Sequence, residues 1–503
     1  MTIHLSILIF WPLALAVLGG LVPRAAAPFF ALVGALVPLG YAVLLIVDFD
    51  AGAGLQYVTD DAWIREFGIR YKLGVDGLNL WLVALTTLLF AASALWVALR
   101  PPVRAKLFAV HFGIAETAVL GAFLAQDLLL FVLFFDLMLV PFYFLVGQWG
   151  GPQRVSAAVK MVVYTLVGSL LMLAGAVATA ILSATGDEPI TFVLSDLVAR
   201  SLPESTQKWI FAAFALAFLI KMPAFPLHGW MPDAYRNMPL PVLAVFSGVV
   251  SKVAAYGFLR IALPLFPQAV VDWRMILLIA ALLSILYGSL QAFTQTDARL
   301  VLGYSSIAQL GFILLGIFAA DAQGAAAQGA LLQAVNHGLV VAPAFFVIAL
   351  LAERAGGSED IRDLGGVAFR APVLATLFLI VTYALLAMPG SANFVGEFMI
   401  LLGTFSTDMA IAIIASTGVV LASVYALRLY IRSIHNRTGP TVTSYDVSVR
   451  DGIVLVPLVL AILAFALYPQ KALEQGERSV RSAVADVVQG GEARAASPRE
   501  ATR

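Results

Sequence analysis

The chain has 503 residues, of which 61% are hydrophobic and only 12% are charged, and its formal net charge is zero. Soluble domains carry about 25% charged residues, so these charges are too few to coat the two or three soluble domains that this length would otherwise imply. The charge balance gives no sign of a nucleic-acid partner. Because the chain has no cysteine, it cannot supply thiolate ligands to an iron–sulfur cluster or zinc, or form a disulfide.

Long apolar runs recur along the whole chain and predict about 14 membrane-spanning helices, since one crossing needs about 20 apolar residues. Helices are expected because lipid cannot satisfy an unpaired backbone. The first run has no basic region before it, so we interpret it as a retained helix and not as a signal peptide. The runs are Leu5–Val22, Pro28–Val47, Leu78–Leu99, Leu107–Ala125, Leu128–Gly147, Met161–Leu182, Trp209–Trp230, Pro241–Leu263, Met275–Thr294, Leu300–Ala320, Gln328–Ala352, Pro372–Thr404, Met409–Ile431 and Ile453–Leu467.

Basic residues gather in alternate connections, and this bias predicts that those connections face the cytoplasm. They are Arg24, Arg100, Arg104, Lys106, Arg154, Lys160, Arg236, Arg299, Arg354, Arg362, Arg370 and Arg437. The opposite side holds Asp48, Asp50, Asp60, Asp61, Asp187, Glu188 and Asp196. An even number of crossings then puts both termini outside the cytoplasm.

Two of the runs are not expected to be continuous helices. Pro223 and Pro226 lie inside the seventh run, and the twelfth run is too long for one crossing and contains Met-Pro-Gly-Ser at 388–391. Proline removes a helix hydrogen bond, and the freed carbonyls must face protein or water. Broken helices in corresponding places are typical of an inverted-repeat transporter.

The pattern therefore predicts an all-α, polytopic membrane fold with two inverted five-helix repeats, each with a broken helix. Its expected parts are an N-terminal three-helix segment (1–106), a first inverted repeat (107–263), a second inverted repeat (275–434), a last transmembrane helix (453–467) and a polar C-terminal tail (469–503).

Four charged residues fall deep inside predicted spans: Asp136, Lys221, Lys252 and Glu397. A charge at the bilayer centre costs about 2.5–3.5 kcal/mol on insertion scales, so such residues are functional candidates. Each has a structural alternative. Asp136 could only hydrogen-bond a neighbouring helix, a lysine could extend toward the interface, and Glu397 could cap the second half-helix.

Three further residues are candidates for the same pathway. His337 lies inside an apolar helix, where it could serve as a relay or only hydrogen-bond a neighbour. His228 follows the first break, and Glu116 lies in the fourth run. A switch that separates Asp136 from Lys221 would weaken the lysine's hold on its proton, and Lys252 and then Glu397 could receive and export it. This order is a hypothesis, because the sequence indicates the carriers and not the steps.

Several motifs resemble those of a known family. Gln126-Asp-Leu-Leu-Leu-Phe-Val-Leu-Phe-Phe-Asp-Leu-Met resembles the fifth-helix motif of the M-type subunits of bacterial complex I, which are equivalent to mitochondrial subunit 4. Lys221-Met-Pro-Ala-Phe-Pro-Leu-His-Gly-Trp is similar to the seventh-helix signature of the wider antiporter-like family. Thr296-Asp-Ala-Arg-Leu-Val-Leu-Gly-Tyr-Ser-Ser and Asn393-Phe-Val-Gly-Glu-Phe resemble its later motifs. The resemblance covers nearly the whole chain.

The resemblance implies a 14-helix antiporter fold and proton translocation in an NADH:quinone oxidoreductase. It implies no cofactor in this chain, with NADH, FMN, iron–sulfur clusters and quinone in other subunits, and L-type and N-type antiporter-like subunits as partners. Two alternatives stay open. One is a subunit of a multisubunit sodium/proton antiporter or membrane-bound hydrogenase, and the other is a membrane scaffold that has lost transport.

The chain departs from the family pattern at four positions. The fifth-helix acid is usually Glu, and here it is Asp136, which is one methylene shorter. Tyr235 and Gln309 stand where the family usually has His, and Ala298 stands where it often has Lys. Proton transfer is therefore expected to depend more on water than in other members of the family.

Overall fold

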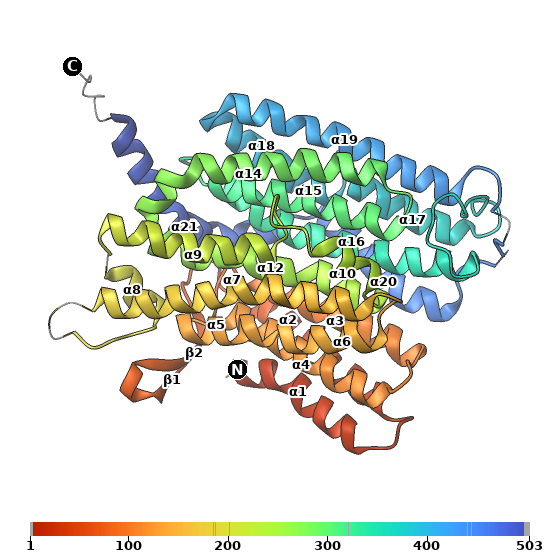
Figure 1. Cartoon of the computed structure of the whole chain (residues 1–503), viewed down its shortest axis with the longest axis horizontal. Coiled ribbons are helices and arrows are strands. Elements are labelled where there is room, and N and C mark those ends of the chain that lie inside the picture. The colour runs from red at the N-terminus through yellow and green to blue at the C-terminus, as the bar shows by residue number, and fades with distance from the viewer. Residues whose placement is uncertain are drawn as a thin grey trace.

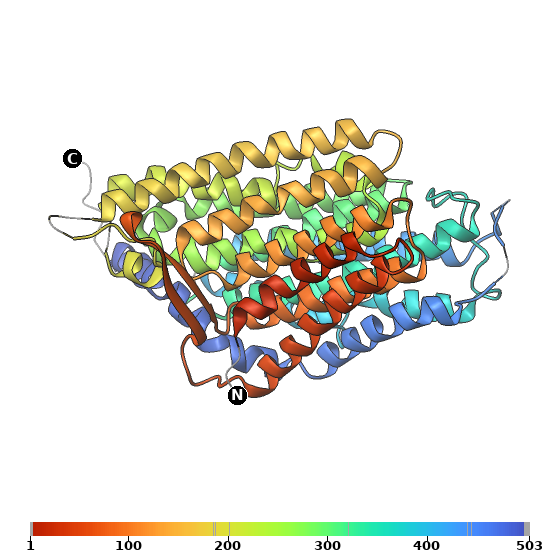
Figure 2. The ribbon, with the colours of Figure 1, turned by 90° about the horizontal axis from the view of Figure 1, so that it is seen from below.

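The computed structural model is an elongated bundle whose helices run close to its long axis (Figure 1). It describes residues 4–184, 186, 188–200, 202–319, 321–439, 441–443 and 445–496. Asp187, Ala320 and the end of the predicted tail lie outside the described residues. The connections that carry the clustered bases lie at one end of the bundle, away from the acidic connections and the start of the chain (Figures 1 and 2).

All fourteen apolar runs coincide with helical segments, as predicted. Among the described residues, eleven helices are long and apolar enough to cross a membrane, so the expected number of about 14 crossings stays a prediction. The segments are α1 Leu5–Leu21, α2 Ala27–Asp48, α3 Leu80–Leu99, α4 Ala105–Leu124, α5 Leu128–Leu137, α6 Leu139–Trp149, α7 Arg154–Ser183, α9 Glu204–Lys221, α10 Met231–Asn237, α11 Leu240–Val245, η2 Phe246–Val250, α12 Ser251–Gly257, η3 Phe258–Ala262, α13 Leu263–Leu265, α14 Pro267–Thr294, α15 Ala298–Phe318, α16 Ala325–Arg354, α17 Pro372–Leu385, α18 Ala392–Thr407, α19 Met409–Ile434 and α20 Val449–Leu467.

A β-hairpin precedes α3, and the sequence analysis did not predict it. The antiparallel strands β1 (Gln56–Ile64) and β2 (Ile69–Val75) are joined by η1 (Arg65–Phe67). Asp60 in β1 accepts a hydrogen bond from Arg70 Nε, and Tyr57 donates to Asp48 over 3.0 Å. Burial and the Asp48 carboxylate raise the pKa of Tyr57 to about 12, so the tyrosine stays a hydrogen-bond donor at neutral pH. A short two-stranded element has too little periodicity to stand out beside long apolar helices.

The predicted polar tail contains a long helix, α21 (Gln470–Ala496), and a short helix, α8 (Leu194–Ala199), follows α7. α21 crosses the acidic-side ends of the other helices (Figure 1) and packs on α13, α14 and α16. Val480, Val484 and Val487 are buried, at spacings that give one helical face. Charged residues between these valines made the segment resemble a solvated tail.

Both predicted helix breaks are confirmed. α9 ends at Lys221 and the chain resumes as α10 at Met231, while α17 and α18 are separated by residues 386–391. Gly390 has a φ of +88° and Ala387 a φ of +49°, a left-handed region that glycine adopts without strain and alanine does not. Tyr383 Oη donates to the free Pro389 carbonyl over 2.7 Å, so a polar group faces the gap.

Matched features occur in the two predicted repeats. Asp127 caps α5 by accepting hydrogen bonds from the amides of residues 129 and 130, and Asp297 caps α15 through residues 299 and 300. Each aspartate also lies on an isolated antiparallel bridge, to Val193 and to Asp360 respectively. The two caps lie at opposite ends of the bundle (Figure 1), as an inverted repeat requires. The domain boundaries themselves stay a prediction.

Gly338 on α16 allows the two predicted repeats to touch through their backbones. A Cβ atom at Gly338 would lie 2.4 Å from the Gly248 carbonyl oxygen in η2 and 2.6 Å from Leu85. Small residues permit such close helix approach in membranes.

We expect Gly338→Ala to destabilise the protein by about 1–3 kcal/mol, because a backbone atom must move to admit the methyl group. The thermal midpoint of the solubilised protein measures this. The matched control is Gly40→Ala, since a Cβ there meets nothing within 4 Å. An equal effect of both substitutions would contradict the packing argument.

Candidate functional site

Lys252 and His337 form a direct hydrogen bond between the predicted repeats. Lys252 Nζ lies 2.9 Å from His337 Nδ1, 2.6 Å from the Ser247 carbonyl oxygen and 3.3 Å from Ser251 Oγ. Three acceptors match the three N–H donors of an ammonium group. When Lys252 is charged, His337 accepts through Nδ1 and carries its proton on Nε2, for which the described structure holds no partner. Both side chains are completely buried.

The local helix geometry places this lysine. Lys252 lies on α12, between the π-helical turns η2 and η3. A π-turn shifts the helix register by one residue and is often found at functional sites. The amine consequently reaches the carbonyl of Ser247, five residues earlier, and the hydroxyl of Ser251.

A second polar cluster surrounds Glu397 behind the break between α17 and α18. Gln333 Nε2 donates to Gln309 Oε1 over 2.7 Å and to Glu397 Oε1 over 3.3 Å. Tyr425 on α19 faces the same group. Glu397 is 2% exposed, so its carboxylate points into the bundle and not toward lipid, as predicted. Its Oε2 atom has no partner among the described residues.

The two clusters are connected through α16. Gln333 and His337 are four residues apart on this helix, a spacing that puts their side chains on one face. Lys252, His337, Gln333 and Glu397 therefore form a buried polar row from α12 to α18. Such a row can pass a proton if water bridges its gaps.

Asp136 and Lys221 are neighbours but do not form a close ion pair. Among the described residues, the Asp136 carboxylate and the Lys221 amine are not an ion pair within 4 Å. Asp136 is nevertheless close enough to be affected by the charge of Lys221. Lys221 Nζ lies 4.8 Å from the ring centroid of Phe135, a cation–π distance. Asp136 is half-buried in the last turn of α5. Pro141, in the first turn of α6, has no N–H to donate to the end of α5, and this missing hydrogen bond accompanies the break between the two helices.

The structure does not bring the remaining two candidates into direct contact with this row. His228 lies in the first break, with its ring stacked on Phe225 at 5.6 Å and 4.8 Å from Tyr287 on α14. Glu116 is buried on α4, and its Oε1 atom has no partner in the described part of the chain. Among the described residues, no group of three or more His, Cys, Asp or Glu side chains could hold a metal ion.

Comparison with known proteins identifies the family. Residues 125–422 match the family model described as NADH:quinone oxidoreductase/Mrp antiporter, TM. The NADH-quinone oxidoreductase subunit M of Rhodobacter capsulatus is 36% identical over 485 residues, 92% of this chain and 93% of that protein. The chain belongs to the NADH:quinone oxidoreductase/Mrp antiporter family.

Solved structures share the fold along almost the whole chain of this family member. A chain of respiratory complex I from Thermus thermophilus with bound NADH matches with a TM-score of 0.88 at 29% identity, over 96% of this chain and 100% of that one. The Mrp complex from Dietzia sp. DQ12-45-1b matches with a TM-score of 0.83 at 21% identity, over 97% and 98%. The second likeness concerns the fold alone.

One contact of this family member involves a position where the resemblance led us to expect histidine. Gln309 accepts a hydrogen bond from Gln333 beside Glu397, so an amide pair occupies this part of the row. Gln333 and Ser247 were missed by the sequence analysis. A buried amide four residues before His337 was the available signal for Gln333, because polar groups are rare inside membrane helices. The acceptor role of the Ser247 carbonyl depends on the π-turn and had no signal.

We expect Asp136→Asn to impair proton pumping severely, because it removes a negative charge that acts on Lys221. Asp136→Glu should keep or raise pumping, since the added methylene extends the carboxylate toward the 4 Å pairing range. Proton pumping in proteoliposomes, with incorporation checked, measures both. Intact pumping with asparagine would mean that the carboxylate is structural.

Proposed function

We propose that this chain is the M-type proton-translocating membrane subunit of an NADH:quinone oxidoreductase. Quinone reduction in other subunits would drive a change in the contact between Asp136 and Lys221. The proton released by Lys221 would pass to Lys252 and His337, and through water beside Gln333 to Glu397. His228 and Glu116 would serve as further groups on the uptake side.

The single observation that carries this proposal is the buried row Lys252–His337–Gln333–Glu397. Buried polar groups in lipid are costly unless they are used or fully paired. Here His337 Nε2, Gln333 Oε1 and Glu397 Oε2 all lack partners in the described structure. Unpaired atoms at successive positions are what a water-filled proton path would require.

Orientation and partners follow from the same proposal. The basic end of the bundle would face the cytoplasm, with both termini on the other side of a bacterial inner membrane. L-type and N-type antiporter-like subunits would be the neighbours of this chain. NADH, FMN, iron–sulfur clusters and quinone would bind in other subunits, and the chain itself would hold no redox centre.

The alternative, a subunit of a sodium/proton antiporter or a membrane-bound hydrogenase, shares the fold. Identity favours the oxidoreductase, because subunit M of Rhodobacter capsulatus is 36% identical and the Mrp chain 21%. Mass spectrometry of the gently solubilised complex would identify the co-purifying chains and separate the two.

We expect Lys221→Ala to abolish or sharply reduce quinone-linked proton pumping while the complex still assembles. The matched control is Lys208→Ala on the same helix, because Lys208 is partly exposed and pairs with Glu204 and Asp272 at the end of the bundle. Pumping is measured in proteoliposomes with an acid-sensitive dye. Near-normal pumping from a fully incorporated Lys221→Ala complex would refute the carrier role of Lys221.

A further inference from the structure

A second charged cluster, in which Asp76 is buried and Arg260 is partly buried, lies outside the row described above, toward the acidic side of the bundle. Arg260 in η3 forms an ion pair with Asp76, which precedes α3, and Arg260 Nε donates to Tyr256 Oη over 3.1 Å. Asp76 is held in place because its carboxylate accepts from the Leu78 amide and its own amide donates to Asn79 Oδ1. Nothing in the proposed proton row uses these groups.

This cluster lies on the acidic side of Lys252, further along the same helical segment. Lys252 and Tyr256 are four residues apart on α12, which puts them on one face, and Tyr256 is joined to Arg260 in η3 by the hydrogen bond above. Arg260 is about 12 Å from Lys252 along the helix axis. The lysine amine itself points the other way, toward the Ser247 carbonyl. A proton on Lys252 would meet Tyr256 and then the ion pair if it moved toward the acidic side.

Two phenylalanine rings pack against the ring of Tyr256. The ring of Phe123 lies 5.5 Å away in an edge-on arrangement, and the ring of Phe131 lies 6.4 Å away. Tyr256 and both phenylalanines are buried. The two phenylalanine rings offer no hydrogen-bonding partners to water, so they disfavour a chain of water along the Tyr256 ring.

Helix α21 covers the acidic-side end of this column. Ser479 Oγ accepts from the Gly77 amide next to Asp76, and a Cβ atom at Gly77 would lie 2.2 Å from the Gln475 carbonyl oxygen. Gln475 accepts from Trp81 Nε1 over 3.0 Å and donates to the Ile46 carbonyl over 3.2 Å. The backbone of α21 is therefore pressed onto the turn that carries Asp76.

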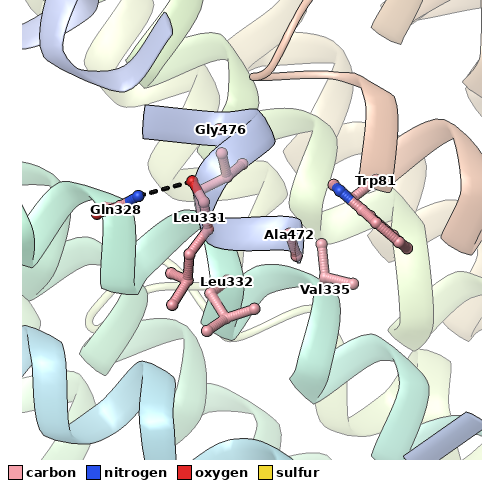
Figure 3. Close-up of a pocket in the computed structure, with 8 residues that line it drawn as sticks. Trp81, Gln328, Leu331, Leu332, Val335, Ala472 and Gly476 are labelled. Carbon is pink, nitrogen blue, oxygen red and sulfur yellow. Dashed lines mark hydrogen bonds between the residues drawn. The ribbon is translucent and has the colours of Figure 1, made fainter. Parts of the chain in front are cut away.

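The same helix also packs closely on α16. Figure 3 shows the junction, where Gln328 Nε2 donates to the Leu473 carbonyl over 2.8 Å. The cavity left between Trp81, Val335 and α21 measures only about 10 Å³, at the lower limit for a single water molecule. This junction between α16 and α21 therefore has room for about one water molecule at most.

We propose that the Asp76–Arg260 ion pair, together with Tyr256 and the covering helix α21, is a seal that prevents protons on Lys252 from leaving or entering at the acidic side of the first repeat. This inference rests on the proposed proton translocation through Lys252. The seal forces a proton on Lys252 to continue to His337 and Glu397. It adds a function for three side chains and for α21 that the carrier row does not include.

The test is a proton-leak measurement on the whole complex in proteoliposomes without NADH. The variant Asp76→Asn/Arg260→Gln removes both charges together, since removal of one alone would leave an unpaired buried charge. An imposed pH gradient should collapse several-fold faster than with the unmodified complex. The protons pumped per NADH oxidised should fall, while the rate of NADH oxidation is kept. Arg260→Lys, which retains the charge, should stay nearly as tight as the unmodified complex.

A second variant tests the cover independently. Gln475→Ala/Ser479→Ala removes the side-chain hydrogen bonds that fix α21 over Asp76 and should also raise the leak. The control is Glu477→Gln/Arg481→Gln, which neutralises an exposed ion pair of the same helix and should not change the leak.

Three results would overturn the seal. One is an unchanged leak and pumping ratio in both assembled test variants. Another is a parallel loss of NADH oxidation and pumping, which would make the cluster part of the carrier path. The third is failure of both variants to assemble, which would make its role structural. The Lys221→Ala variant separates failure of the seal from failure of the proposed function. If Lys221→Ala does not pump while the leak of both seal variants is unchanged, only the seal is wrong.

Discussion

The hydrogen bond between Lys252 and His337 is the contact on which the proposed site depends. It joins α12 to α16 at a point where both side chains are fully buried. A lysine in such a place needs a partner for each N–H group, and the π-turn supplies one by bringing the Ser247 carbonyl within reach. Close packing of Gly248 against Gly338 holds the two helices at the distance that this bond requires.

An amide pair, Gln309 and Gln333, lies beside Glu397 at the other end of the row. Gln309 and Gln333 donate and accept hydrogen bonds but do not titrate, so an amide pair orients Glu397 without carrying a proton itself. In the proposed pathway, the proton therefore passes between His337 and Glu397 on water. The unpaired atoms along this part of the row are suitable partners for it.

Different contacts close the two ends of the bundle. At the basic end, Arg299 donates to the carbonyls of Tyr235, Arg236 and Met238 and pairs with Glu359, which joins the end of α10 to the start of α15 and to the connection after α16. At the acidic end, the Asp76–Arg260 pair and α21 close the column below Lys252. In the proposed pathway, closure at that end directs proton transfer along the row from Lys252 to Glu397.

Sequence alone determined the apolar helices, both breaks and the buried charges of this family member, because these features depend on local composition and on the cost of polar groups in lipid. Pro223 and Pro389 marked the breaks without any knowledge of tertiary contacts. The tertiary structure decided which charges meet: Lys252 pairs with His337, 85 positions away, and Asp136 stays beyond ion-pair distance of Lys221. It also decided that α21 is a helix packed on the bundle. Helix register, π-turns and the packing of charged segments depend on neighbours distant in sequence, and no local pattern encodes them.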